Sequence, residues 1–530
     1  MADTNNMSAE ALSQRFGPMY RWLVTLTVMI GSITMGLAST MVNVAVPSVM
    51  GAFGVGLDQA QWMATGFLAT MSATMLLSSW LIEVLGQRIT FTLTLVVFGV
   101  GSLLSGTAQN METLVLGRVL QGAASGVGQP LAMFSIFSVF PADRRGTALG
   151  IYGLGSVLAP TFGPILAGLA IDHISWRYLF FTPLPFCGVA LLLGLAFMPW
   201  KSLAARLPPF DWIGFAVILI LMFSLLGGLA NGPRWGWDSD AVLARLLLAG
   251  AMLLLFIVWE LRAPYPLLDL SLFQSYPFSL TMITSFAFGV GLFSSGYFIP
   301  VFVQTIQQYN ATEAGFLLAP GGLVMMLFFP LAGRITDTIP AHIPIAAGLL
   351  IFSAGFFLIQ AVDVNTTFWA LVAYTAITRV GLSLCIPSLN VAALRAVPPE
   401  KLARGASAST FFRNTGGGIG IALLTAYFQH RTQIHGEAFT ATQTSSNETT
   451  AAFLEATLRL LDASGMGGMT QASLALQHLS QSILAQASTW GFKDTFLAIA
   501  VMALVAAIPA MLLGHHWRKR STAGQEAQAT

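Results

Sequence analysis

The chain has 530 residues, of which 55% are hydrophobic and only 9% are charged, and its formal net charge is +2. Ordinary soluble domains carry about 25% charged residues, so no soluble fold could cover this much apolar surface. The small net charge and the scatter of basic residues among the loops argue against a nucleic-acid-binding protein. The composition therefore predicts a membrane protein surrounded by lipids.

Apolar runs of at least the length of a spanning helix, about 20 residues, recur along nearly the whole chain. Backbone groups in lipid must be satisfied internally, and these runs far exceed the ~10-residue alternating strands of a barrel. We therefore predict an all-α polytopic membrane protein. The fourteen expected spans cover residues 20–48, 59–84, 89–108, 112–139, 146–170, 177–198, 211–230, 241–262, 277–304, 312–334, 343–361, 367–395, 403–430 and 491–516.

The distribution of Lys and Arg predicts the orientation of these spans, because cytoplasmic loops of membrane proteins are enriched in both residues. With the N-terminus inside, fifteen of the 24 basic residues fall on the cytoplasmic side and six outside. An error of one span would scramble this bias, so we expect both termini in the cytoplasm. Three basic residues remain within spans: Arg118, Arg379 and Arg413.

The chain resembles itself at an offset of roughly 255 to 260 residues, which indicates an internal repeat. The loop around Pro141 recurs around Pro398, and Arg118 recurs as Arg379. Two six-helix bundles related by pseudo-two-fold symmetry follow, with two helices inserted between them. The predicted domains are a cytoplasmic segment 1–19, an N-terminal bundle 20–198, a linker with two extra helices 199–262, a C-terminal bundle 263–516 with a periplasmic loop 431–490, and a cytoplasmic tail 517–530.

Two segments carry the most specific patterns. In the fourth span, Arg118 and Gln121 lie at a depth where an arginine costs several kcal/mol unless it is paired or faces water, so it marks an internal cavity. Bonding of this arginine to helix-end carbonyls is the structural alternative. In the fifth span, small residues and prolines would let helices approach closely and bend, at Pro160, Gly163, Pro164 and Gly168.

These segments resemble the major facilitator superfamily and, within it, the fourteen-span drug:proton antiporters of the EmrB/QacA type, over essentially the whole chain. The resemblance implies an exporter in a bacterial inner membrane that needs no cofactor besides the proton gradient. It ties the Arg118 motif to proton movement, and it makes the fifth-span motif a signature of exporters. The family's first-helix motif matches Ala38, Thr40, Asn43 and Pro47, with Ala38 in a slot that is usually acidic.

A cytoplasmic gate is expected at the loop after the second span and at its counterpart in the second half. Glu83, Gly86 and Arg88 resemble a degraded form of the family's gating motif, and Gly333 with Asp337 resembles a cleaner form. An acid at the cytoplasmic end of one helix can pair with a base of the neighbouring half when the gate closes. For Glu83, a simple surface charge is an equal alternative.

The usual proton-carrying carboxylate is missing, because none of the 22 Asp and Glu residues falls in the middle of a span. Coupling to protons would need an acid near a membrane face, with Asp58, Glu112 and Asp172 as candidates, or a substrate that carries its own proton. With arginines as the intramembrane charges, we expect neutral or anionic lipophilic substrates more than cationic ones.

The loop 431–490 is the only long segment expected outside the membrane. Apolar residues at helical spacing include Phe453, Leu458, Leu461, Leu479 and Ile483. The loop resembles that of EmrB-like pumps, which implies docking of a periplasmic membrane-fusion adaptor leading to an outer-membrane channel. A tolerated insertion is the alternative.

The pattern as a whole favours export of small lipophilic compounds by proton-coupled alternating access, and not an enzyme. No lysine follows a glycine, which excludes a P-loop, and Cys187 and Cys385 lie within apolar runs and predict neither a disulfide nor a metal site. Uptake or lipid translocation by the same fold is one alternative. A receptor or assembly subunit without transport is another.

Overall fold

The computed structural model describes residues 9–140, 145–200, 209–398, 401–444, 446–463 and 469–529. Within these segments the regular elements are all helices, as expected. The first half contains α1 Ala9–Phe16, α2 Met19–Val44, α3 Val46–Phe53, α4 Leu57–Ala60, α5 Trp62–Gly106, α6 Met111–Val139, α7 Arg145–His173, α8 Tyr178–Phe181 and α9 Leu184–Phe197. Then follow α10 Trp212–Trp235, α11 Asp240–Glu260, the 3-10 helix η3 Leu270–Gln274, α12 Tyr276–Thr305, α13 Ala311–Thr338, α14 His342–Gln360, α15 Phe368–Arg395, α16 Leu402–Ala441, α17 Glu448–Ala463 and α18 Met469–Ala529.

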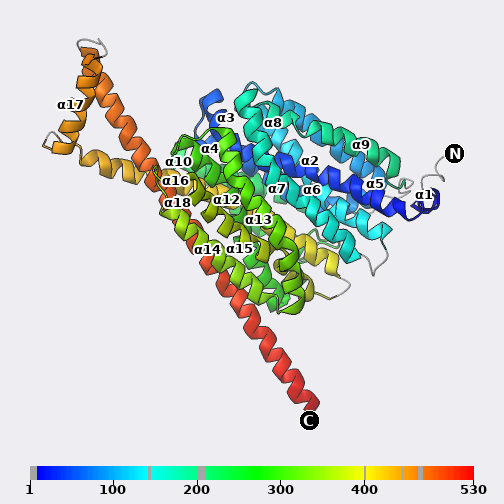
Figure 1. The fold of residues 1–530 in the computed structure, drawn as a ribbon. Helices are drawn as coiled ribbons and strands as arrows, with labels where there is room; N and C mark the ends of the chain where they lie inside the picture. Colours follow the sequence, from blue (N-terminus) through cyan, green and yellow to red (C-terminus); the bar gives the residue numbers. More distant parts are fainter. Residues whose placement is uncertain are drawn as a thin grey trace.

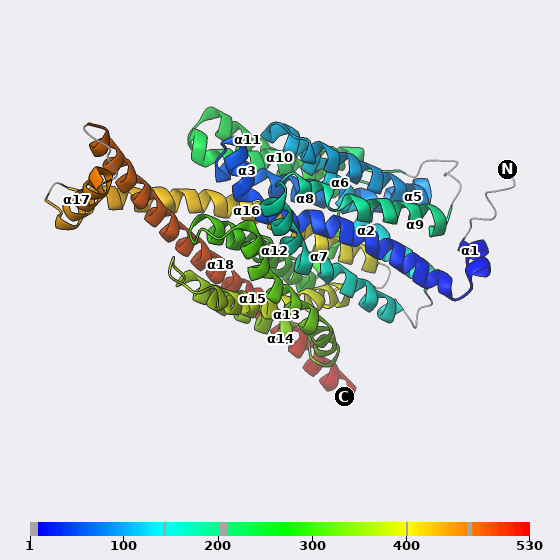
Figure 2. The ribbon, with the colours of Figure 1, turned by 45° about the horizontal axis from the view of Figure 1, so that its top comes forward.

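The helices form two groups that pack side by side (Figures 1 and 2). In the N-terminal group, α2 packs on α6, α7 and α9, and the two arms of α5 flank α6. In the C-terminal group, α12 packs on α16 and α18, while α14 packs on α15 and α18. The groups meet mainly where α7 contacts α13 and α5 contacts α16. A site between the halves would therefore be lined by these four helices together with α2 and α12.

The two extra helices lie at the edge of both groups. Helix α10 contacts α5 of the first group and α16 of the second, while α11 packs mainly on α10. Large apolar side chains on α11 are exposed, with Leu247 73% and Leu254 67% accessible. Such a surface is stable only against lipid, so α11 lies on the outside of the bundle.

Ten helical segments within the described residues are long and apolar enough to cross a membrane. One of them, Leu57–Gly106, covers two of the predicted spans, which are continuous except for Gly86 with φ 74° and ψ 170°. A residue with a side chain rarely adopts this backbone conformation, so glycine is required at the bend. The predicted total of fourteen spans stays a prediction.

The first predicted span, 20–48, is wrong at its end. Helix α2 stops at Val44, and α3 begins at Val46 with Pro47 in its first turn. Proline has no backbone N–H to donate to the preceding turn, and its fixed φ suits the start of a helix. The proline therefore divides one predicted helix into two.

The segment expected as a long loop is largely helical. Helix α16 continues to Ala441, α17 folds back beside α18, and α18 runs on into the bundle without a break (Figure 1). We call residues 431–490 the hairpin, and the end of the bundle from which it projects the hairpin end. The first roughly 20 residues of α18 extend about 30 Å at the rise of an α-helix.

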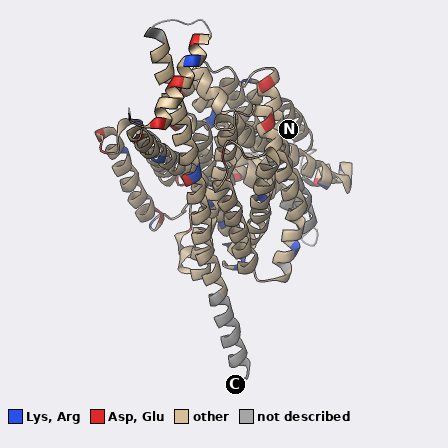
Figure 3. Cartoon of the chain, turned by 60° about the vertical axis from the view of Figure 1, so that its left-hand side comes forward, with Lys and Arg blue, Asp and Glu red and all other residues tan. Residues whose placement is uncertain are grey.

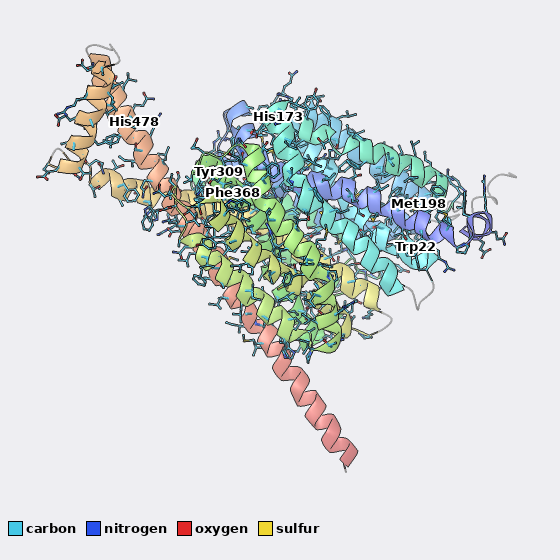
Figure 4. The ribbon with its side chains drawn as sticks, in the orientation of Figure 1. Trp22, His173, Met198, Tyr309, Phe368 and His478 are labelled. Atoms are coloured by element: carbon cyan, nitrogen blue, oxygen red, sulfur yellow. The ribbon has the colours of Figure 1, made fainter. Side chains whose placement is uncertain are left out.

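The labelled side chains show which connections share an end of the bundle. His173, Tyr309 and Phe368 lie toward the hairpin end, and Trp22 and Met198 lie toward the opposite end (Figure 4). The predicted topology likewise places the first three residues on one side of the membrane and Trp22 and Met198 on the other. Charged residues are sparse along the bundle and are more frequent on the projecting hairpin (Figure 3).

Candidate functional site

The side chain of Arg118 on α6 is fully buried. Its Nε donates to the carbonyl of Met63 at 2.9 Å, and its Nη1 donates to the carbonyl of Ala38 at 3.0 Å and to Gln121 Oε1 at 2.6 Å. The guanidinium carbon lies 4.3 Å from the centroid of the Phe67 ring. The cation therefore ties α2, α5 and α6 together through charge-assisted hydrogen bonds and a cation–π contact.

Among the described residues Arg118 has no ion-pair partner, and its buried Nη2 has no hydrogen-bond partner. Gln121 is held in turn by its Nε2, which donates to Ser102 Oγ at 2.7 Å. The Ala38 carbonyl accepts from the guanidinium, so position 38, where an acidic residue is expected from the first-helix motif, lies beside the buried cation. The alanine at this position brings no negative charge to the arginine.

The first-helix and fifth-helix motifs meet in the structure. Thr40 Oγ1 donates to the Gly36 carbonyl at 3.0 Å and to the Ala159 carbonyl on α7 at 3.3 Å. A Cβ on Gly163 would lie 2.5 Å from Thr40 Oγ1, so only glycine lets α2 and α7 approach this closely. Asn43, from the same motif, lies close to α12, because a Cβ on Gly296 would be 3.4 Å from Asn43 Nδ2.

Helix α7 also packs against α13 across the two groups, through backbone contacts on both sides. A Cβ on Gly168 would overlap the carbonyl of Ala311, and a Cβ on Gly315 would overlap the carbonyl of Pro164. Backbone atoms cannot move aside as a side chain can, so both glycines are required for this approach. The side chain of Pro160 lies outside the described residues, and the prediction for it stays open.

Asp172 closes the same contact at the hairpin end. Its Oδ2 accepts from the backbone N–H of Thr312 at 2.7 Å, and its Oδ1 accepts from that of Ala311 at 3.3 Å. These are the first two residues of α13, whose free N–H groups and helix dipole favour a carboxylate. Asp172 is therefore an inter-bundle helix cap.

Asp58, on α4, is the most buried of the three predicted proton carriers, with 8% exposure. Gln429 Nε2 of α16 donates to its Oδ1 over 3.4 Å, a long bond. The side chain of Tyr297 on α12 is fully buried, and its hydroxyl has no hydrogen-bond partner among the described residues. Asp58 thus lies where the first group faces α16. The sequence pattern gave no indication of Tyr297 or Gln429, because both lie in distant spans.

The third candidate is different. Glu112 is exposed in the first turn of α6, next to Asn110, which caps the helix by accepting from the Thr113 N–H at 2.8 Å. A carboxylate in a first turn stabilises the helix through the dipole, which accounts for its position without a role in proton transfer.

The prediction of a cytoplasmic gate stays open, because the side chain of one of its acids lies outside the described residues. Glu83 is exposed, and a Cβ on Gly333 would find nothing within 4 Å, so close packing does not require that glycine. Gly86, by contrast, is required by its positive φ, and its carbonyl accepts from Thr90 Oγ1 at 2.7 Å. Arg88 is half-buried. The side chain of Asp337 lies outside the described residues.

The two remaining intramembrane arginines lie in the C-terminal group, apart from Arg118. Arg379 packs its Cγ against Gly321 of α13, and a Cβ there would lie 2.9 Å away. Arg413 Nη1 reaches Asn390 Oδ1 over 3.4 Å. Neither residue makes an ion pair within the described segments.

The predicted apolar residues of the hairpin pack mainly within it. The side chains of Phe453, Leu458, Leu461, Leu479 and Ile483 are half-buried, and the Phe453 ring stacks on His478 at 5.4 Å. Large leucines are instead exposed at neighbouring positions, with Leu460 74%, Leu476 57% and Leu484 61% accessible. The predicted residues therefore hold α17 on α18, and other leucines face outward.

An unexpected charged cluster joins the hairpin to the bundle. Asp494 Oδ2 accepts from Arg431 Nε and lies 2.8 Å from His435 Nε2, which links α18 to α16. Arg431 and Asp494 are 63 positions apart in the chain, which hides the pair from sequence patterns. As for metals, the part of the chain that is described holds no group of three or more His, Cys, Asp or Glu side chains that converge.

Comparison with known proteins agrees with this geometry. The family model described as Major Facilitator Superfamily matches residues 28–421. The multidrug export protein EmrB of Haemophilus influenzae is 30% identical over 422 residues, 78% of this chain and 81% of that protein. The multidrug transporter protein MdtP of Bacillus subtilis is 29% identical over 412 residues, 78% and 76% of the two chains. A bacterial homolog to the human lysosomal transporter Spinster, solved in an inward-facing and occupied conformation, superposes with a TM-score of 0.61 at 16% identity, covering 94% of this chain and 98% of that one.

Proposed function

The chain belongs to the major facilitator superfamily and is a membrane transporter, and from this premise we propose that it exports small lipophilic compounds by proton-coupled alternating access. Two relatives named for multidrug transport or export support this choice of substrate class. The proposal divides the chain into two six-helix bundles, 20–198 and 263–516, that rock about a site between them, with the inserted helices of 199–262 at their edge.

The contact between α7 and α13 is the observation that carries the proposed alternating-access mechanism. Gly168 and Gly315 bring the two helices into backbone contact, and Asp172 caps α13 across the interface. These contacts close the hairpin end. A rocking motion that opens this end must separate them together, so the fifth-helix motif works as a hinge between two discrete states.

Asp58 is our proposed proton carrier. It is a buried carboxylate between the halves, and within the described residues its side chain is held by one long bond from Gln429. When the halves part, Gln429 moves away with its bundle, and the carboxylate gains access to water. Such a change of environment is what couples a proton to a conformational state.

The buried arginines lead us to propose neutral or anionic lipophilic substrates over cations. Arg118 is fully buried, and within the described residues neither it nor Arg379 nor Arg413 makes an ion pair. If these cations border the cavity that opens between the halves, they repel a lipophilic cation and attract an anion.

We further propose that the hairpin end faces the periplasm of a bacterial inner membrane, with both termini in the cytoplasm, and that the hairpin docks a membrane-fusion adaptor. The exposed leucines Leu460, Leu476 and Leu484 offer an apolar surface outside the bundle. Deleting 440–485 tests this, because the deletion keeps the anchor between Arg431 and Asp494. Loss of whole-cell resistance with intact transport in vesicles supports docking, while loss of both means that the hairpin supports the fold.

Proteoliposomes with an imposed proton gradient test the transport proposal itself. We expect a weakly acidic lipophile to be moved against its gradient with proton exchange, and Asp58→Asn to abolish the exchange while binding persists. Movement with the opposite sense would support uptake, and binding without any flux would support a receptor. Robust export of a permanent cation would overturn the proposed selectivity.

A further inference from the structure

Two acidic residues lie together at the end of α10 and α11 that is remote from the hairpin. Asp211 precedes α10, and Glu260 ends α11; their exposed fractions are 9% and 3%. Trp212, next to Asp211, packs against Trp80 of α5 with ring centroids 5.3 Å apart. Gly227, near the other end of α10, faces Trp62 at the start of α5, so the two ends of α10 lie beside different parts of α5. The pair is separate from Asp58, Arg118 and every residue used in the proposed function.

The two carboxylates are satisfied to very different extents. Asp211 Oδ1 accepts from the Gly214 N–H at 2.9 Å, and the indole N–H of Trp259 donates to both Asp211 oxygens, at 2.8 and 2.9 Å. Glu260 Oε2 accepts from the Leu268 N–H at 3.1 Å. Glu260 Oε1, however, is buried without a hydrogen-bond partner. The backbone of Leu267 and Leu268 also provides donors to Glu260, so of the four carboxylate oxygens only Glu260 Oε1 has no partner among the described residues.

The unpartnered oxygen of Glu260 and one oxygen of Asp211 lie around the same glycine. A Cβ built on Gly214 would overlap Asp211 Oδ2 and lie 3.1 Å from Glu260 Oε1, so both oxygens border the space above this glycine. Two ionised carboxylates in one buried pocket are strongly disfavoured unless a cation or proton lies between them.

No basic side chain of the described segments neutralises the pair. Arg262 is exposed beyond the end of α11, and Glu83 on the neighbouring α5 is exposed as well. Asp269 of the adjoining loop is engaged with Lys401 and Arg404 of the α16 end, each at 2.9 Å. The remaining basic residues of this region, Lys201 and Arg206, lie outside the described residues.

We propose that Asp211 and Glu260 form a proton-binding site, in which Glu260 retains one proton and donates it through Oε1 to Asp211 Oδ2. The proton comes from bulk water on that side of the membrane, and no other group is consumed. In this state the pair links the ends of α10 and α11. Through Leu268 it also holds the loop that carries Asp269 and reaches α16. Loss of the proton puts two negative charges in the pocket and loosens this connection.

Infrared spectroscopy of the purified full-length protein at neutral pH tests the site directly, because only a protonated carboxyl shows the carbonyl stretching band of an acid. We expect a band in the wild type that disappears in Glu260→Gln, whose amide takes the place of the protonated acid. Asp211→Asn should also remove it, since its amide N–H can donate to an ionised Glu260. Glu448→Gln, at an exposed position on α17, is the matched control and should leave the band unchanged.

A second measurement follows the same proton through stability. If Glu260 keeps this proton in the folded protein and loses it on unfolding, the thermal stability of the wild type should fall as the pH rises above neutral, and Glu260→Gln should lack this fall. Identical infrared spectra for wild type and Glu260→Gln would overturn the proposal. So would a wild-type band that appears only after sodium and potassium are removed, because a metal cation would then occupy the site. Both readouts are independent of transport, so their failure leaves the proposed export untouched.

Discussion

Replacing Gly315 by alanine should prevent the closed contact between α7 and α13. The added Cβ would overlap the Pro164 carbonyl oxygen and lie 2.8 Å from its carbonyl carbon and 3.0 Å from the Ile165 Cα. All three are backbone atoms, so the helices must separate by several tenths of an ångström or more. Overpacking of this kind costs about 1–3 kcal/mol.

That cost falls on one conformational state. If the contact exists only when the hairpin end is closed, destabilisation by about 1–3 kcal/mol shifts the balance between the two states roughly 5- to 150-fold toward the open one. A cysteine at position 312, next to the contact, reports the shift through its labelling rate with a membrane-impermeant thiol reagent. The native Cys187 and Cys385 are both buried, so their background is small.

Gly250→Ala is the control, because it lies inside helix α11 and its added Cβ meets nothing within 4 Å. Both variants gain about 1 kcal/mol of helix propensity, which therefore cancels in the comparison. We expect faster labelling and reduced transport for Gly315→Ala and wild-type behaviour for Gly250→Ala. Equal labelling and equal transport in the two variants would refute the reasoning that this contact is part of the conformational switch.

The other predictions concern buried or paired charges. Arg118→Lys keeps the charge but cannot reach all three acceptors at once, so thermal unfolding should show a loss of about 1–3 kcal/mol and transport should fall; unchanged unfolding would contradict the network. Although burial alone would raise it, the pKa of Asp269 is held well below its ordinary value by hydrogen bonds from Ser271 and from its two basic partners. This stabilisation is present above the pKa of the unfolded chain and is lost as the pH falls through the pKa of the folded protein. Asp269→Asn should therefore destabilise the protein at pH 7 by about 1–3 kcal/mol. A difference between variant and wild type that persists undiminished at strongly acidic pH would count against this explanation. Asp494→Asn should loosen the hairpin and speed its proteolysis without affecting vesicle transport; an unchanged cleavage rate would mean that the cluster does not anchor it.

The sequence predicted the fold class because lipid imposes a simple rule on composition, and the family comparison confirms it. Helix ends were less predictable, since hydropathy does not register a single proline or glycine within an apolar run. Pro47 divides a predicted span, and Gly86 joins two spans that were expected to be separated by a loop. In both cases the backbone chemistry of one residue decides the outcome.

The candidate site was predictable in its residues more than in its contacts. For the arginine in an apolar run, bonding to carbonyls was one of the two alternatives, but the two carbonyls that accept from Arg118 belong to Met63 and Ala38 of other helices, and the sequence could not identify them. The three acidic candidates looked alike in sequence, yet Asp58 is buried between the halves, Asp172 caps a helix and Glu112 is exposed. Their difference arises from which helix end each one faces in the folded protein, and that is a property of the tertiary packing.

Helix α18 runs unbroken from Met469 to Ala529, so the hairpin and the C-terminal bundle share one rigid rod. A bundle rotation of about 15°, ordinary for such rearrangements, would swing a projection of about 30 Å through roughly 8 Å at its tip. A protein bound at the tip would thus be displaced in each transport cycle, and a protein that immobilised the tip would slow the cycle. The hairpin is therefore a lever as well as a surface, and it can transmit mechanical work in either direction.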